Sequence, residues 1–177
     1  MQYSREAQEL LRRSAEKARH LGHSYVGSVH LLMALSGQRG IAGYLLGSFG
    51  VREEMTGHMA VVLYGGGTPE LPLCQGFTRH AAAILRGAAA EAKHAKSSMV
   101  EPVHIFLSML RREGAASADF MRIYGIDTQE LFHRTVEYMQ LGNRGNEMKK
   151  EAASMRLLEQ FSEDLIQKAS TMDPVIG

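Results

Sequence analysis

Histidines are the side chains whose spacing in this sequence first suggests chemistry. His20, His23 and His30 lie close together, and His94 and His104 repeat two of them 74 positions later. Imidazole binds metals, but protein zinc sites gather three or four ligands. No carboxylate or cysteine joins these histidines at ligand spacing. Their equal placement in two segments instead favours a structural role, such as a bond to a loop carbonyl, and we predict no metal site.

Catalytic groups are similarly sparse. Cys74 is the only cysteine, which excludes an intramolecular disulfide, and we interpret it as an incidental exposed thiol in a proline-flanked loop. The run Gly65-Gly66-Gly67-Thr68 lacks the lysine that meets phosphates in the G-x-x-x-x-G-K-[ST] motif, which the sequence does not contain. Without a nucleophile–base pair or a paired carboxylate site, we expect no enzyme activity from this chain.

Two hydroxyl residues, Ser4 and Thr78, are separated by the same 74 positions. Each directly precedes a helical apolar pattern, where a side-chain oxygen can accept a bond from a free backbone N–H group. Tyr3 and Phe77 stand just before them, in the position of a hydrophobic staple. We therefore interpret Ser4 and Thr78 as helix caps. Tyr3 and Phe77 are either staples or surface residues that contact a ligand, and one side chain can do both.

These equal separations of 74 positions arise from an internal repeat. Val26-x-x-Val29-His30 returns as Val100-x-x-Val103-His104 with the same separation of 74, and Phe49-Gly50-Val51 returns as Tyr124-Gly125-Ile126 with a separation of 75. A repeat of this length is a small folding unit. Two such units packed together form a pseudo-twofold pair of surfaces, which suits binding better than catalysis.

The apolar spacing predicts an all-α fold, a pseudo-twofold tandem repeat of two four-helix units. We assign residues 1–64 to the first unit, 65–76 to a glycine- and proline-containing linker and 77–141 to the second unit. In the first unit, helices are expected from Ser4 to about Gly22, from a cap at Ser28 through residue 35, over 41–49 and over 51–64. In the second, they are expected over 78–95, 102–112, 115–124 and 127–140. The second helix of each unit is apolar nearly all round and should be buried.

The last part of the chain follows a different pattern. Residues 142–156 are polar and contain glycine, and they read as a second linker that is helical only towards its end. An apolar helical stripe then runs from Leu157 to Ala169, and Pro174 follows it. Nothing in the two units is left to bury this stripe, so we expect its packing partner to lie beyond Gly177.

The composition limits the classes of partner that this chain is expected to bind. The formal charge is +1, from 20 basic and 19 acidic residues, which argues against a large nucleic-acid-binding surface. No apolar run approaches the roughly 18 residues of a membrane span, and the first residues lack the apolar core of a signal peptide. We expect a cytoplasmic protein that binds neither nucleic acid nor membranes.

The repeat resembles the N-terminal domain of the Clp family of AAA+ protein unfoldases, of the ClpC and ClpA type. The similarity is carried by residues 18–27 and 77–81, by the buried run 29–35, and by the loops 39–42 and 113–116. The tail is more specific: residues 158–161 and Asp173-Pro174-Val175-Ile176-Gly177 are similar to the lead-in to the first ATPase module. In the longer protein that this resemblance implies, Val175, Ile176 and Gly177 would border the adenine pocket, and residues 157–177 would begin a truncated AAA+ module.

The resemblance implies a receptor domain that collects protein substrates or adaptor proteins for a hexameric ATPase ring, which feeds a ClpP-like peptidase. The chain itself is then expected to be a monomer without a cofactor, whereas the full-length protein would be a homohexamer that uses ATP and magnesium. The alternative is a stand-alone Clp-like adaptor or peptide-binding helical module without an ATPase.

The resemblance also suggests binding residues. Several ClpC domains recognise phosphorylated arginine with a hydroxyl at the start of each repeat's first helix and a glutamate at the start of its second helix. Ser4 and Thr78 match the hydroxyls, but Val29 and Val103 occupy the glutamate positions. Glu101 could replace the missing carboxylate of the second repeat only if its side chain reaches back. In the family, the region of Tyr3 and Phe77 forms a groove for adaptors and peptide-like ligands.

Overall fold

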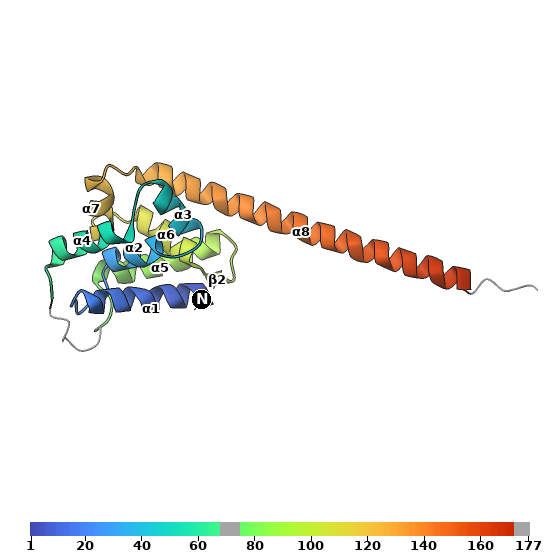
Figure 1. Ribbon diagram of the computed structural model, residues 1–177, viewed down its shortest axis with the longest axis horizontal. Helices are drawn as coiled ribbons and strands as arrows, with labels where there is room; N and C mark the ends of the chain where they lie inside the picture. The colour runs from blue at the N-terminus through green and yellow to red at the C-terminus, as the bar shows by residue number, and fades with distance from the viewer. Residues whose placement is uncertain (68–74, 172–177) are drawn as a thin grey trace, which may run out of the picture. The chain divides into compact units, whose positions relative to one another are not determined.

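The computed structural model describes residues 1–67 and 75–171, with side chains described as far as residue 160. The first repeat contains α1 (Arg5–His20), α2 (Ser28–Ser36), α3 (Ile41–Ser48) and α4 (Glu53–Tyr64). The second contains α5 (Arg79–His94), α6 (Pro102–Arg111), α7 (Ala116–Ile123) and the start of α8 (Thr128–Thr171) (Figure 1). The predicted all-α double repeat is confirmed. Cys74, most of the predicted linker 65–76, and Val175, Ile176 and Gly177 lie outside the described residues.

The core forms around α2 and α6, the two helices whose sequences are apolar on nearly every face. Leu31 of α2 and Ile105 and Phe106 of α6 have no exposed surface. Helices α5 and α6 approach closely because Gly87 has no side chain: a Cβ atom there would lie 2.3 Å from the Ser108 hydroxyl. This burial confirms the predicted role of the second helix in each repeat.

Two short strand pairings, which the sequence pattern does not predict, join the repeats. β1 (Gln2–Tyr3) pairs in parallel with β2 (Met99–Val100), so that Tyr3 lies opposite Val100. An isolated parallel bridge joins Val26 and Phe77. Because Tyr3 and Phe77 are equivalent, as are Val26 and Val100, the two pairings are related by the pseudo-twofold repeat. The segment before the first helix of each repeat therefore pairs with a strand segment of the other repeat.

Ser28 connects the repeats rather than capping its own helix. We expected Ser28 to be the N-cap of the second helix, but Gly27 holds that position and Ser28 is the first helical residue. The Ser28 hydroxyl instead accepts a hydrogen bond from the backbone N–H group of Ser117, with an N–O distance of 3.0 Å. The serine that seemed to cap α2 thus fastens the start of α7 to the first repeat.

Helix α8 differs from the sequence expectation. Residues 142–156, predicted as a linker that is helical only towards its end, are helical throughout. Glu, Lys, Met and Ala dominate residues 147–153, and their high helix propensity outweighs the cost of Gly142 and Gly145. The chain divides into a compact unit, Met1–Val136, and a second unit, Glu137–Gly177.

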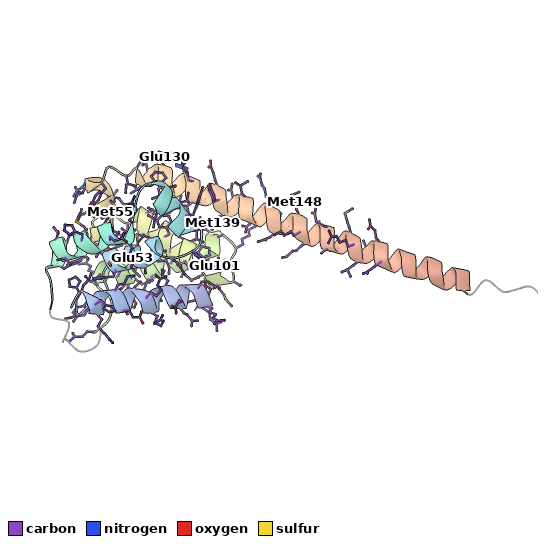
Figure 2. All side chains as sticks on the ribbon, in the orientation of Figure 1. Glu53, Met55, Glu101, Glu130, Met139 and Met148 are labelled. Carbon is purple, nitrogen blue, oxygen red and sulfur yellow. The ribbon has the colours of Figure 1, made fainter. Side chains whose placement is uncertain are left out.

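The described side chains of the second unit lie mainly in solvent. Met148, labelled in Figure 2, is 69% exposed. Leu157 and Leu158 are also exposed. The rest of that stripe lies where side chains are not described. None of the helices in the described residues combines the length and the apolar character needed to cross a membrane.

The core assignment predicts a large mutational cost at Phe106. Phe106→Ala should lower the free energy of unfolding by about 3–5 kcal/mol, because it removes a large buried side chain and leaves a cavity. Val62→Ala, at a side chain 64% exposed on α4, is the control and should change it by less than about 0.5 kcal/mol. Urea unfolding followed by circular dichroism measures both. Equal effects of the two substitutions would contradict the assignment.

Candidate functional site

The hydroxyls of Ser4 and Thr78 cap helices, as predicted. The Ser4 hydroxyl accepts a hydrogen bond from the Ala7 N–H group at 3.1 Å, and the Thr78 hydroxyl accepts one from the Ala81 N–H group at 3.2 Å. Both caps are held from the opposite repeat. The Ser4 N–H group donates to the Val100 carbonyl and the Thr78 N–H group donates to the Val26 carbonyl, each at 2.9 Å. Any site that uses these hydroxyls is therefore built from both repeats.

Tyr3 and Phe77 lie at opposite ends of α1. Tyr3 directly precedes the capped start of α1, whereas Phe77 pairs with Val26, shortly after α1 ends. A helix of 16 residues is about 24 Å long. The two aromatic residues consequently flank opposite ends of the first helix and do not line one small cleft together. Tyr3 packs partly against the core, and burial raises the pKa of its phenol, whereas Phe77 is 39% exposed.

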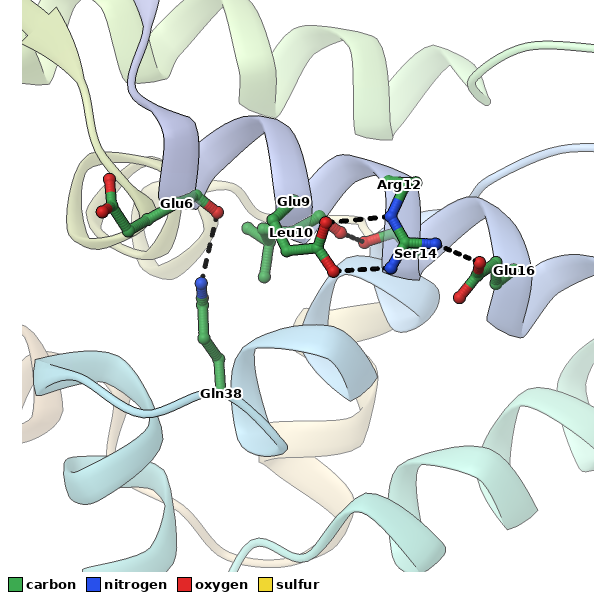
Figure 3. A network of polar contacts seen from close by, with 7 residues as sticks. All are labelled: Glu6, Glu9, Leu10, Arg12, Ser14, Glu16 and Gln38. Carbon is green, nitrogen blue, oxygen red and sulfur yellow. Dashed lines mark hydrogen bonds and ion pairs between the residues drawn. The ribbon is translucent and has the colours of Figure 1, made fainter.

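Val103 and Glu101 line a shared pocket of about 260 Å³, which we call the Val103 pocket. Glu6 and Arg39 of the first repeat also line it, together with Pro102 and the start of α3. The Gln38 side-chain amide donates to the Glu6 carbonyl at 3.2 Å and connects the loop before α3 to α1 (Figure 3). The pocket thus combines two carboxylates and one guanidinium around an apolar valine. Nothing in the sequence pattern marks Glu6 and Arg39 as neighbours of Val103, because only the packing of the two repeats brings them here.

Val29, the equivalent of Val103, has a different environment. It has no exposed surface and packs in a small cluster with Met33 and Ala60. A partly buried alanine of α7, Ala116, packs against the same cluster. The two equivalent valines therefore do not form equivalent sites.

A second pocket, of about 380 Å³, lies on the Thr78 side of the molecule, and we call it the His23 pocket. It is lined by backbone of the loops after α1 and α4 and by the rings of His23, Tyr25, His30 and Tyr64, with Thr78 at its edge. Close backbone packing shapes it: a Cβ atom at Gly67 would lie 1.8 Å from the Gly22 carbonyl oxygen. Among the described residues, no Lys, Arg, Asp or Glu lines this pocket, so it suits an uncharged or aromatic ligand group.

Two histidines connect three loops through a chain of hydrogen bonds. The Gly27 N–H group donates to His30 Nδ1 at 2.8 Å, so the proton of a neutral His30 is on Nε2. His30 Nε2 lies 2.8 Å from His23 Nδ1, and His23 Nε2 lies 2.7 Å from the Gly65 carbonyl oxygen. Since a carbonyl only accepts, the order Gly27→His30→His23→Gly65 satisfies every atom when both rings are neutral.

The repeated pair His30 and His104 has the expected structural role, but each ring accepts from a backbone N–H group at a helix start and does not bond a loop carbonyl. The bond to a loop carbonyl is made by His23, which has no equivalent in the second repeat. His104 repeats the cap of His30: its Nδ1 atom accepts from the Glu101 N–H group at 2.9 Å. Burial lowers the pKa of both rings, and for His30 burial together with the neighbouring His23 lowers it to about 4. In the described part of the chain, no three His, Cys, Asp or Glu side chains gather as a metal site.

Two helical repeats, locked together by reciprocal strand pairs and carrying pockets where they meet, define a binding module. The comparisons with known proteins specify which one. Residues 2–58 and 76–170 match the Clp repeat (R) N-terminal domain. The chain belongs to this family.

Known relatives agree with this assignment. The chain is 31% identical over 179 residues to the ATP-dependent Clp protease ATP-binding subunit ClpC of Staphylococcus aureus (strain USA300), covering 97% of this chain and 21% of that protein. It is 26% identical over 183 residues to the chaperone protein ClpB of Oceanobacillus iheyensis, covering 99% of this chain and 22% of the relative. The chain therefore spans about a fifth of the length of these relatives.

Solved structures share the fold. The N-terminal domain of the chaperone ClpD from Arabidopsis thaliana superimposes with a TM-score of 0.65 at 15% identity, covering 78% of this chain and 97% of that one. The Hsp104 N-terminal domain from Candida albicans gives a TM-score of 0.66 at 16% identity, covering 78% and 91%. At these identities the likeness concerns the fold alone.

The histidine chain predicts a loss of stability in acid. His30 titrates near pH 6.5 when unfolded but only near pH 4 when folded. The unfolded state thus binds more protons between these values, and stability falls as the pH falls through this window. Between pH 7.5 and pH 5, His30 should account for a loss of about 2 kcal/mol. Urea unfolding at both pH values measures it.

Two variants separate the contribution of His30 to the pH dependence of stability from that of the other histidines. His30→Gln should be less stable at pH 7.5 but should lose less stability on acidification than the natural chain. His20→Gln, at an exposed side chain, should keep the natural pH dependence. An unchanged pH dependence in His30→Gln would contradict the assigned role.

Proposed function

We infer that this chain is a domain that recruits protein substrates or adaptors for an ATP-dependent Clp-type unfoldase. The observation that carries the proposal is the Clp double-repeat fold itself, with pockets assembled between the two repeats and no catalytic constellation in the described residues. Membership of the Clp repeat N-terminal domain family supports it, as does the similarity to a segment of ClpC and ClpB proteins.

The activities of a whole unfoldase belong to this proposal as well. The sequence contains no phosphate-binding loop, so ATP and magnesium would act on further modules of a longer, homohexameric protein in the cytoplasm. A ClpP-like peptidase would associate with those modules, while this domain would be monomeric by itself. Tethering such a receptor near the entrance of the ring raises the effective concentration of captured protein there without new contacts.

The His23 pocket favours apolar protein segments over charged ligands. Valine occupies both positions at which a carboxylate would be needed to pair with a guanidinium, and the His23 pocket is lined by aromatic rings and backbone. Exposed Phe77 stands beside Thr78 at the edge of that pocket. An unfolded segment that presents aromatic or aliphatic side chains fits this surface better than a phosphorylated one.

The recruiting role predicts binding of an unfolded protein. Fluorescently labelled casein should bind the purified chain saturably in an anisotropy titration. Phe77→Ser should weaken this binding at least about fivefold, because the exposed ring would lose its apolar contact with the ligand. Ile123→Ser, at an exposed apolar residue of α7, is the control and should bind like the natural chain. Absence of casein binding, or equal losses in both variants, would contradict the role assigned to Phe77.

The valine positions predict an absence of phosphoarginine binding. Calorimetric titration of the natural chain with phosphoarginine should give no saturable heat, because neither Val29 nor Val103 can pair with the guanidinium. Val103→Glu should create measurable affinity, since residue 103 lines a pocket. Val103→Gln, of similar size but uncharged, is the control and should not. Tight binding by the natural chain would show that another carboxylate, such as Glu101, holds the guanidinium.

A further inference from the structure

The strand edge at Tyr25 carries backbone groups that the folded chain does not use. In the parallel bridge between Val26 and Phe77, the Val26 N–H group donates to the Gly76 carbonyl at 2.8 Å. The Val26 carbonyl accepts from the Thr78 N–H group at 2.9 Å. Since neighbouring residues of a strand direct their backbone groups to opposite sides, the N–H and C=O groups of Tyr25 point away from this bridge. Neither group of Tyr25 is hydrogen-bonded to any described residue, and such unpaired edge groups are a template for pairing with another chain.

The second repeat closes the equivalent edge with a side chain. Met99 corresponds to Tyr25 at the separation of 74, and it precedes Val100, the residue of β2 that bonds to the other repeat. The Ser97 hydroxyl donates to the Met99 carbonyl at 2.8 Å and accepts from the Met99 N–H group at 3.4 Å. Both outward backbone groups of Met99 are therefore occupied within the folded chain.

Histidine replaces this serine in the first repeat. His23 corresponds to Ser97, and its two ring nitrogens are engaged by His30 Nε2 at 2.8 Å and by the Gly65 carbonyl oxygen at 2.7 Å. An imidazole ring has no third polar atom, so His23 has nothing left to offer the backbone of Tyr25. The residue that builds the His23 pocket thus leaves the neighbouring strand edge open.

The strands that pair with these two edges differ in the same sense. The Tyr3 carbonyl of β1 accepts from the Gln8 side-chain amide at 3.0 Å. Phe77 is the equivalent of Tyr3, and Ala82 stands at the position of Gln8. Among the described residues, the Phe77 carbonyl has no hydrogen-bond partner. Side chains therefore occupy outward backbone groups on both strands of the β1–β2 pair, whereas the bridge beside the His23 pocket keeps such groups free.

The open edge borders the uncharged His23 pocket. Ser24 and Tyr25 line this pocket opposite no charged side chain of the described residues, and the rings of Tyr25 and Tyr64 are each about half exposed. Residues directly opposite each other in paired strands place their side chains on the same face. A residue that pairs with Tyr25 would therefore present its side chain beside the Tyr25 ring. The pocket volume of about 380 Å³ accommodates an aromatic or aliphatic side chain there.

We propose that an extended segment of an unfolded protein adds to this edge as a β-strand, with its backbone bonded to Tyr25 and an apolar side chain in the His23 pocket. Backbone hydrogen bonds accept many sequences, and the pocket adds a preference for an aromatic or aliphatic residue. A helical ligand does not fit, because its backbone groups are already bonded within the helix. The proposal rests on the proposed function, because it specifies how a recruiting domain would hold an unfolded substrate.

Amide hydrogen exchange tests the backbone contact directly. The probe is a fluorescein-labelled Gly-Ser-Thr-Val-Phe-Val-Thr-Ser-Gly peptide, and its binding to the purified chain is followed by anisotropy. At saturation, exchange of the Tyr25 N–H group, measured by NMR, should slow at least about tenfold, because it gains a hydrogen bond. Exchange at Met99, which Ser97 already occupies, should not change. Absence of peptide binding, or unchanged exchange at Tyr25, would overturn the proposal. Protection of Tyr25 that rises with protein concentration without peptide would place a second copy of this chain on the edge and would also overturn it.

A matched pair of variants tests the open edge. His23→Ser introduces the residue with which the second repeat closes its edge, whereas His23→Ala removes the same ring and leaves the Tyr25 backbone unpaired. The peptide should therefore bind His23→Ser at least about fivefold more weakly than His23→Ala, because the serine hydroxyl competes for the same backbone groups. Melting temperatures establish that both variants fold. Equal affinities of the two folded variants would overturn the proposal.

N-methylated peptides test the same contact on the natural chain. Methylation of one peptide nitrogen at a time should weaken binding about tenfold at the position that donates to the Tyr25 carbonyl, and less than about twofold elsewhere. Equal effects at all positions would show that side chains alone hold the peptide and would overturn the proposal. Casein binding distinguishes the hypotheses: its retention without strand addition rejects only this contact, whereas its absence contradicts the recruiting role.

Discussion

The reciprocal pairing of two short strand segments is the constraint on which the arrangement of the sites depends. Tyr3 lies opposite Val100 and Val26 lies opposite Phe77, and in each pairing the next residue, Ser4 or Thr78, donates its N–H group to the other repeat. Strands this short are not stable alone. They persist because α2 and α6 bury the core beside them, and they set where each repeat's first helix begins. Every site that uses the start of α1 or α5 therefore belongs to both repeats.

The same constraint allows the two halves to differ chemically. His30 and His104 cap their helices identically through Nδ1. Only the first repeat adds a second histidine, His23, because Ser97 stands at the equivalent position. The first half consequently carries a neutral aromatic pocket, whereas the second carries a pocket edged by Glu101. A pseudo-symmetric backbone thus presents two chemically different pockets.

The sequence was sufficient for the features that depend on local periodicity. The apolar spacing located the helices of the first repeat and α5 to α7, and the hydroxyls before α1 and α5 identified two caps. The sequence was insufficient where contacts between residues far apart in the chain determine the structure. A two-residue strand leaves no alternating pattern to detect, and Ser28 looked like a cap because its partner, Ser117, is 89 positions away. Glu6 and Arg39 drew no attention, since only the contact between repeats places them beside Val103. Gly142 and Gly145 suggest a break in α8, but the strong helix formers that follow them outweigh this signal.

An internal repeat separates the requirements of folding from those of function within one chain. Where equivalent positions agree in kind, as at Leu46 and Met121, a common core explains both residues. Where one repeat buries Ala42 and the other buries at the equivalent position the hydroxyl of Ser117, which is unpaired among the described residues, packing explains only the alanine, since the same backbone forms without the polar atom.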